Sequence, residues 1–217
     1  RLMEYYENVI NVPFFTSEEC DEIKDYALQI EQGLIDDGFA DHKEHGSYDN
    51  VLTSNYFRYN FFAHHPHYAE RLAQCLHYVM PDQNLEWPIA VQAWCNVYRN
   101  GQGIDWHNHS GTMGKSYTAN IFIDGPTAPG ITYKAFNKKS GVIENQKGHM
   151  HIIPCELFHK VSKNKTDEPR FTIGLTVHSY QTISKTLIDR YAFNSKTYQD
   201  TIILTREHIM YDETEQS

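Results

Sequence analysis

The sequence predicts an α+β fold in which helices come first along the chain and pack on one face of a β-sandwich or barrel. Three observations favour this class. The chain has 217 residues, enough for one sizeable domain, and 40% of them are hydrophobic. Aromatic residues, which favour strands, make up 13% of the chain. Apolar residues recur at helical spacing in the first part of the chain and at a spacing of two from residue 88 onward.

The first expected helix starts at a capping box, in which the Thr16 hydroxyl and the Glu19 carboxylate each accept a hydrogen bond from the other residue's backbone N–H. A polar loop is expected over 36–50. A second helix is expected to begin near Pro66, because proline is favoured in the first helical turn, and to end before Pro81.

Short strands are expected through the second half of the chain. There, apolar residues alternate with polar ones, or run together, between turns rich in Gly, Pro and Asn. The expected strand segments are 89–98, 116–124, 130–136, 142–146, 148–154 and 170–180.

No internal repeat, linker or low-complexity segment divides the chain, so we expect a single domain over residues 1–217. Within it, helical support is expected over 1–86, the sheet core over 87–180 and a C-terminal extension over 181–217. No run of about 18 apolar residues is present, so neither a membrane-spanning helix nor a membrane partner is expected.

The net charge indicates which partners to expect, and the cysteine pattern indicates the cellular compartment. The chain has 19 Lys and Arg against 28 Asp and Glu, a net charge of −9, so nucleic acid is not an expected partner. The four cysteines form no Cys-x-x-Cys pair and sit among apolar residues, so we expect reduced core thiols in a cytoplasmic protein. These cysteines are Cys20, Cys75, Cys95 and Cys155.

Three of the thirteen histidines have the spacing of metal ligands. His107 and His109 project from the same side of an extended segment, so both imidazoles can reach one ion. His159 follows after enough residues for several strands to return the chain beside the first pair. The sequence therefore predicts a metal site made by these three side chains.

Two longer motifs surround these histidines. Residues 98–107 have the form Tyr-x-x-Gly-Gln-x-x-x-x-His, and residues 148–161 have the form Gly-x-x-x-x-x-Pro-x-x-x-x-His-x-Val. An Arg-x-Thr sequence follows at 170–172. In this order and spacing, the motifs resemble those of the 2-oxoglutarate/Fe(II)-dependent dioxygenases, in particular the prolyl-4-hydroxylase-like group. The resemblance covers roughly residues 89–180.

The resemblance implies a double-stranded β-helix (jelly-roll) core with the N-terminal helices packed on one face. It also implies an enzyme that uses Fe(II), 2-oxoglutarate and O2 to hydroxylate a substrate, with decarboxylation of 2-oxoglutarate to succinate. The implied substrate is a peptidyl residue such as proline, or a small molecule. The implied metal ligands are His107, His109 and His159, and the implied cosubstrate contacts are Arg170, Thr172, Tyr98 and Asn120.

The chain departs from the family at His109, where the family has an acidic ligand. Three interpretations follow. We favour an all-histidine site, because Trp94, Asn96 and the His-x-His pair resemble a phage and cyanobacterial branch of the superfamily. Alternatively, Asp105 supplies a carboxylate from the same strand face as His107. In the third interpretation, the altered site has lost oxygenase chemistry.

Two other functions are compatible with the histidine pattern. The segments that end at His109 and His159 approximate the two metal motifs of cupins, which include three-histidine dioxygenases that need no cosubstrate. A cupin has no need of Arg170 and Thr172, however, and this chain lacks the glutamate of the first cupin motif. The other alternative is a non-catalytic β-sandwich module that contains a metal.

The remaining candidate residues have simpler expected roles. His149 and His151 are expected to pack or to line the pocket rim, and Trp106 is expected to form an apolar wall beside the metal. The alternative role for Arg170 is a surface ion pair with Asp167 or Glu168. The cluster of His64, His65 and His67, which opens the second helix, is expected to be solvated.

Overall fold

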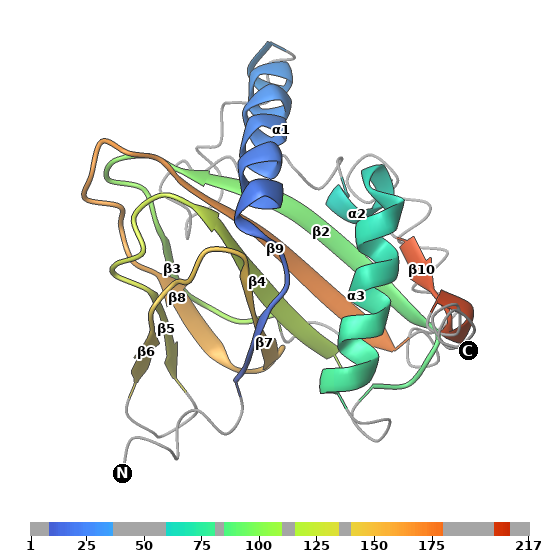
Figure 1. Ribbon diagram of the computed structural model, residues 1–217. Coiled ribbons are helices and arrows are strands. Elements are labelled where there is room, and N and C mark those ends of the chain that lie inside the picture. The colour runs from blue at the N-terminus through green and yellow to red at the C-terminus, as the bar shows by residue number, and fades with distance from the viewer. Residues whose placement is uncertain are drawn as a thin grey trace.

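The computed structural model describes residues 9–36, 60–80, 85–109, 116–134, 140–179 and 202–208. Two antiparallel sheets face each other, and helices cover the outer face of the larger sheet (Figure 1). The larger sheet has the strand order β1-β7-β4-β9-β2-β10, and the smaller sheet has β3-β8-β5-β6. This is the α+β jelly-roll architecture expected from the sequence.

The strands have the following bounds. The larger sheet contains β1 (Ile10–Pro13), β7 (His149–Pro154), β4 (Ser116–Asp124), β9 (Arg170–Ser179), β2 (Ile89–Tyr98) and β10 (Ile202–Leu204). The smaller sheet contains β3 (Ile104–His107), β8 (Phe158–Val161), β5 (Ile131–Lys134) and β6 (Gly141–Ile143).

The central strands β2 and β9 separate the apolar core from the interior between the sheets, because alternate side chains point to opposite faces of a strand. The β9 side chains in the core beneath the helices are Phe171, Ile173, Leu175 and Val177. The alternate residues Arg170, Thr172 and Gly174 therefore face the smaller sheet. Their partners across the strand pair on β2 are Tyr98, Asn96 and Trp94, respectively.

Helix α1 (Ser17–Asp36) begins where the capping box predicts. The Thr16 backbone N–H donates to a Glu19 carboxylate oxygen at 2.9 Å, and the Glu19 N–H donates to the Thr16 hydroxyl oxygen at 3.2 Å. Cys20, Ile23 and Ala27 recur at helical spacing on its buried face. This face packs on β4 and β2, so α1 anchors the outer face of the larger sheet.

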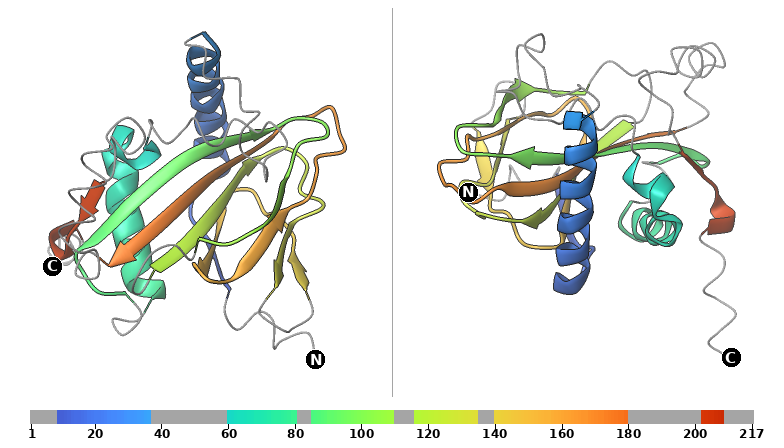
Figure 2. Two further views of the ribbon diagram at one scale, coloured as in Figure 1. Left: turned by 180° about the vertical axis from the view of Figure 1, so that it is seen from behind. Right: turned by 90° about the horizontal axis from the view of Figure 1, so that it is seen from above.

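Helices α2 (Phe61–His64) and α3 (Pro66–Val79) cover the rest of that face. Figures 1 and 2 show α1 and α3 on the same side of the larger sheet. Two hydrogen bonds of 2.7 and 2.8 Å join the Arg71 guanidinium of α3 to the Glu19 carboxylate of α1. This bidentate ion pair links the two helices at the end of α1 that carries the cap.

The structure confirms the strands expected at 89–98 and 116–124 and corrects the bounds of others. The segment expected at 142–146 is the shorter strand β6, and the described part of the segment expected at 130–136 is β5. The sequence patterns missed the short elements β1, β8, β10 and α2. Most of the polar loop expected at 36–50 and most of the expected C-terminal extension lie outside the described residues.

The expectation that the histidine cluster at the start of α3 is solvated was wrong for His65. His65 is half-buried, its ring stacks on Phe61 with 4.4 Å between centroids, and its Nδ1 lies 2.9 Å from the Phe61 carbonyl oxygen. His64 and His67 are exposed, as expected.

The cysteines are free thiols, as expected from the sequence. Cys20, Cys95 and Cys155 are buried, whereas Cys75 is partly exposed. Burial raises the pKa of the Cys95 thiol to about 12, so this side chain packs as an uncharged thiol. Among the described helices, none is both long and apolar enough to cross a membrane.

Candidate metal centre

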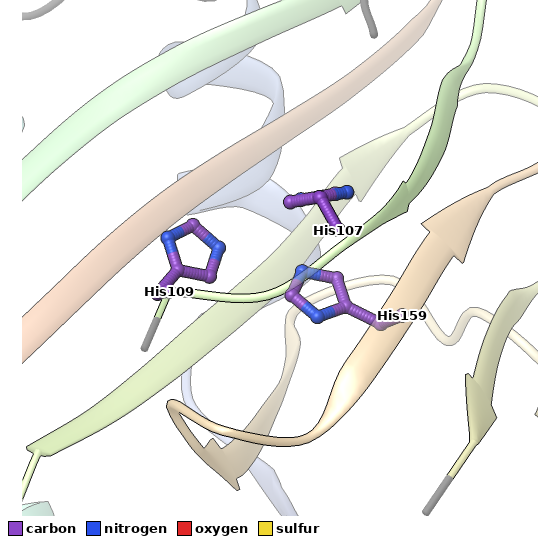
Figure 3. Close-up of side chains that lie close together, drawn as sticks. All are labelled: His107, His109 and His159. Carbon is purple, nitrogen blue, oxygen red and sulfur yellow. The ribbon is translucent and has the colours of Figure 1, made fainter. Parts of the chain in front are cut away.

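Three histidines, two on neighbouring strands and one just after a strand end, converge at one end of the smaller sheet. His107 ends β3, His109 follows two residues later, and His159 lies on β8 directly opposite His107. One potential ligand atom from each residue lies within 4.8 Å of the other two. Figure 3 shows the three imidazoles grouped around one point, which is the arrangement that a single metal ion requires.

Backbone carbonyls orient two of the three rings. His107 Nδ1 lies 2.7 Å from the Asp105 carbonyl oxygen, and His159 Nδ1 lies 3.2 Å from the Leu157 carbonyl oxygen. A carbonyl only accepts, so each Nδ1 carries the proton and donates it. The lone pair of each ring is then on Nε2, where it is available to a metal.

The surroundings keep the three imidazoles neutral. Desolvation lowers the pKa of His107, lowers that of His109 to about 4, and lowers that of His159 well below its ordinary value. Mutual repulsion between the rings adds to the effect at His109 and His159. Neutral imidazole is the form that binds metal, so the site is ready to bind a divalent ion at neutral pH.

Asp105 lies outside this cluster, so the geometry does not support the interpretation in which its carboxylate is the third ligand. The residue is exposed, and its Oδ1 accepts a hydrogen bond of 2.7 Å from the Trp106 backbone N–H. The backbone carbonyl of Asp105, rather than its side chain, serves the site by orienting His107.

A cavity between the two sheets contains the histidines and two of the predicted cosubstrate contacts. Its lining residues are Trp94, Asn96, Tyr98, Ile104, His107, His109, Thr118, Ala119, Asn120, Ile131, Tyr133, His151, Ile153, His159, Val161 and Gly174. Tyr98 and Asn120 are thus beside the histidine cluster. Arg170 and Thr172 are not among the lining residues but lie beside two of them, since the guanidinium carbon of Arg170 is 5.9 Å from the Tyr98 ring centroid and the Thr172 hydroxyl accepts a hydrogen bond from Asn96.

Arg170 is buried, with 1% of its surface exposed, and its guanidinium is incompletely paired. Nη1 donates to the Ser162 carbonyl oxygen at 3.2 Å, whereas Nε and Nη2 have no hydrogen-bond partner within the described part of the chain. The alternative role of a surface ion pair was therefore wrong. Burial lowers the pKa of Arg170 from its ordinary value, which shows the cost of its charge in this place. Two free buried donors on a cation fit an anionic ligand that enters from the cavity.

Trp106 does not form the expected wall beside the metal. It does not line the cavity, and the Lys160 ammonium lies 5.0 Å from its ring centroid on the other face of the small sheet. The wall is instead Trp94, which lines the cavity with its ring centroid 6.3 Å from that of His109. The available signal was its position two residues before Asn96 on one strand, because residues two apart on a strand share a face.

Sequence reasoning also missed a polar pair on the opposite side of the cavity. The Tyr133 hydroxyl of β5 and His151 Nδ1 of β7 are 3.2 Å apart, so this contact joins the two sheets. Burial lowers the pKa of His151 to about 4. His151 faces Asn120 across the β7–β4 pair, which agrees with the pocket-lining role expected for it.

No family profile and no curated protein sequence matches the chain. Solved structures do match over most of its length. The non-heme alpha ketoglutarate dependent epimerase SnoN from nogalamycin biosynthesis has a TM-score of 0.59 at 16% identity, over 82% of this chain and 81% of that one. The collagen prolyl hydroxylase vCPH from Paramecium bursaria Chlorella virus-1 has a TM-score of 0.55 at 13% identity, over 79% and 96%.

A prolyl-4-hydroxylase from Pseudomonas putida matches in the same way, with a TM-score of 0.53 at 10% identity over 82% of this chain and 96% of that one. At these identities the similarity is one of fold. The chain has the fold of the 2-oxoglutarate/Fe(II)-dependent oxygenases, prolyl hydroxylases among them, as the sequence motifs implied.

Proposed function

Since the chain has the oxygenase fold and three converging neutral histidines, we propose that it is a dioxygenase dependent on Fe(II) and 2-oxoglutarate. In this proposal it hydroxylates a small molecule or a peptidyl residue such as proline. The observation that carries the proposal is the guanidinium of Arg170, which is buried next to the cavity-lining Tyr98 and has two nitrogens without a hydrogen-bond partner among the described residues. We propose that residues 1–217 form one catalytic domain.

His107, His109 and His159 would hold the metal. Three neutral imidazoles on one side of a six-coordinate ion leave positions for a chelating 2-oxo acid and for dioxygen, which is the arrangement used by non-heme iron oxygenases. When bound, the iron and 2-oxoglutarate activate dioxygen for hydroxylation, and the 2-oxo acid leaves as succinate. Because no ligand is a carboxylate, the site is one unit more positive than the family's usual one, which favours a dianionic cosubstrate.

Four other side chains would hold the cosubstrate. Nε and Nη2 of Arg170 can donate to its far carboxylate, and this pairing would offset the cost of burying the guanidinium. The Thr172 hydroxyl can donate to the same group, because it projects from the same face of β9. Tyr98 and Asn120 line the same cavity as the histidines and would contact the cosubstrate there.

Within the described residues, the cavity lining offers a substrate no charged side chain. The described lining contains no carboxylate, Lys or Arg, so the group of the substrate that enters the cavity is expected to be uncharged. Two solved structures with this fold illustrate how different the molecules bound by such proteins are. SnoN was solved with Fe3+, alpha ketoglutarate and nogalamycin RO, and a prolyl hydroxylase from Trichoplax adhaerens was solved with a hypoxia inducible factor peptide fragment. The net charge of −9 and the four free thiols support a substrate other than nucleic acid and a reducing, cytoplasmic location.

Arg170 also distinguishes this proposal from the cupin and binding-module alternatives. A three-histidine cupin needs no far-carboxylate partner. A non-catalytic module has no use for a buried cation that has no ion pair within the described residues, because such a charge is costly to retain. In the dioxygenase proposal, the far carboxylate of 2-oxoglutarate pairs with the Arg170 guanidinium.

The test is an anaerobic titration of the Fe(II)-loaded protein with 2-oxoglutarate, followed through the visible charge-transfer band of the chelate. We expect Arg170→Ala to keep its iron and to bind 2-oxoglutarate at least about a hundredfold more weakly, because a buried carboxylate loses its partner. Arg71→Ala is the matched control, since it also removes a guanidinium but Arg71 lies on α3, paired with Glu19 and away from the cavity.

2-Oxovalerate has the same length as 2-oxoglutarate but lacks the far carboxylate, so Arg170→Ala should bind it as the parent does. A parent protein that gives no band with 2-oxoglutarate would contradict the proposal. Equal affinities of the parent and Arg170→Ala for 2-oxoglutarate would also contradict it and would favour the cupin alternative.

A further inference from the structure

The three histidines are not oriented by the same means. Carbonyl oxygens fix the rings of His107 and His159 through Nδ1. His109 is attached by its backbone N–H, which donates to the Cys155 carbonyl oxygen at 2.8 Å, but no hydrogen bond to its ring is formed by the residues that the structure describes. Among the described residues, the ring of His109 is therefore held by packing.

Trp94 provides the packing on the side of the larger sheet. Its indole is 8% exposed, lines the cavity and lies at an interplanar angle of 35° to the His109 ring, with 6.3 Å between centroids. The His159 ring stacks on His109 from the smaller sheet, at an angle of 15° and a centroid distance of 5.2 Å. The His107 ring lies edge-on to His109 at a centroid distance of 5.4 Å, so Trp94 is the neighbouring ring from the larger sheet and the two other histidines are those from the smaller sheet.

Gly174 makes room for the indole. It lies in the middle of β9 directly opposite Trp94, and its φ is outside the left-handed region, so the backbone does not require glycine there. A Cβ at this position would lie 2.6 Å from the indole Nε1, 2.7 Å from Cε2 and 2.9 Å from Cζ2. Because glycine weakens a strand interior, its presence at this contact indicates that the close approach of the indole is needed.

The rigid indole cannot absorb such an overlap by bending. A side chain at position 174 points from the inner face of β9 into the space that the indole fills, so it would push the whole ring away from the sheet. His109 lies in contact with that ring, so the displacement reaches the metal ligand.

We propose that Trp94, seated on Gly174, is a positioning residue that aims the His109 imidazole at the metal. This proposal rests on the metal site of the proposed function and explains how histidine replaces the family's acid. A carboxylate can coordinate with either oxygen, whereas an imidazole must point one nitrogen at the ion, so its ring plane has to be fixed. Trp94 takes the place of the hydrogen bond that fixes the other two rings.

The test measures Co(II) affinity and the visible d–d spectrum of the full-length protein without any cosubstrate. We expect Gly174→Ala to lower the affinity at least about tenfold and to change the spectrum, as the loss of an orienting partner does at other metal sites. Trp94→Phe removes the indole atoms nearest Gly174 and should also lower the Co(II) affinity. This variant provides the test if Gly174→Ala does not fold. Trp106→Phe is the matched control, because Trp106 is adjacent to His107 but faces away from the cavity.

A double-mutant cycle separates positioning from a general effect on folding. In the His109→Ala background, Gly174→Ala should change Co(II) affinity by less than about twofold, because its effect acts through His109. An equal loss in both backgrounds would overturn the proposal, as would parent-like affinity and spectrum in both Gly174→Ala and Trp94→Phe. A parent that binds no Co(II) would overturn the metal site itself, and this proposal with it.

Discussion

The Asn96 amide nitrogen donates a hydrogen bond of 3.0 Å to the Thr172 hydroxyl oxygen across the paired strands β2 and β9. Both side chains are buried on the face that looks toward the smaller sheet. Since the Thr172 oxygen accepts this bond, its own proton is free to be donated to another group. Arg170 lies two residues earlier on the same face, and its Nε and Nη2, which have no partner in the described part of the chain, can donate in the same region.

We therefore predict that the Thr172 proton contributes to cosubstrate binding. Thr172→Val keeps the shape of the side chain but removes the donor, and it should weaken 2-oxoglutarate binding about fivefold, the effect of about 1 kcal/mol for one hydrogen bond. Thr172→Ser should bind nearly as the parent does. Calorimetric titration of the Fe(II) proteins without oxygen measures both. If Thr172→Val binds 2-oxoglutarate as the parent does, the hydroxyl serves only to accept the hydrogen bond from Asn96.

The metal ligands are expected to be individually necessary. His107→Ala, His109→Ala and His159→Ala should each weaken Fe(II) binding by more than about a hundredfold, because losing a residue that merely hydrogen-bonds to a ligand already costs about 10- to 100-fold. His151→Ala is the control, since His151 lines the same cavity but is hydrogen-bonded to Tyr133 and is not one of the three converging histidines. Iron analysis of the purified folded variants decides the matter. Stoichiometric iron in all three ligand variants would refute the assignment.

His109→Asp should keep the metal, because it supplies the acidic ligand found at this place in the related family. The new carboxylate lowers the charge of the site by one unit, so 2-oxoglutarate should bind roughly tenfold more weakly. His109→Asn, which adds no charge, is the matched comparison. The two affinities are measured by the same anaerobic titration. Tighter binding to His109→Asp than to the parent would show that charge does not control cosubstrate affinity here.

Acid should destabilise the fold through histidines that are buried in the neutral form. Burial lowers the pKa of His178 to about 4 from an ordinary value of 6.5, and its Nδ1 lies 2.9 Å from the Ser116 hydroxyl. The unfolded chain binds the proton first as the pH falls, so this contribution to stability is full above about 6.5 and declines toward 4.

His178→Asn should therefore lose less stability than the parent between about pH 7 and pH 5, by roughly 1–2 kcal/mol. Urea unfolding of the metal-free proteins at the two pH values gives the difference. Parallel losses in parent and variant would show that His178 does not carry this pH dependence.

The sequence was informative where spacing alone decides the geometry. The capping box placed the start of α1, and the His-x-His spacing with a later histidine identified three rings that the fold brings together. Alternation within β9 also put Arg170 and Thr172 on one face. In each case the local period of the chain determines the side on which a residue lies.

Contacts between distant segments were beyond the sequence. Trp106 is next to the predicted metal ligand His107 in the sequence, but its indole faces away from the cavity and contacts Lys160. The pairing of β3 with β8 shifts register between Ile104 and His107, in the segment that contains Trp106. Trp94 reaches the site only because β2 pairs with β9 in a register that places Gly174 beneath it. The strands β1, β8 and β10 have four residues or fewer, too short to show a period.

The most direct test of the central claim is a crystal structure of the anaerobic protein with Fe(II) and 2-oxoglutarate. We predict one iron bound by nitrogens of His107, His109 and His159 and chelated by the 2-oxo acid. The far carboxylate should accept hydrogen bonds from Nε or Nη2 of Arg170. An iron bound by Asp105, or a 2-oxo acid whose far carboxylate lies away from Arg170, would contradict the account.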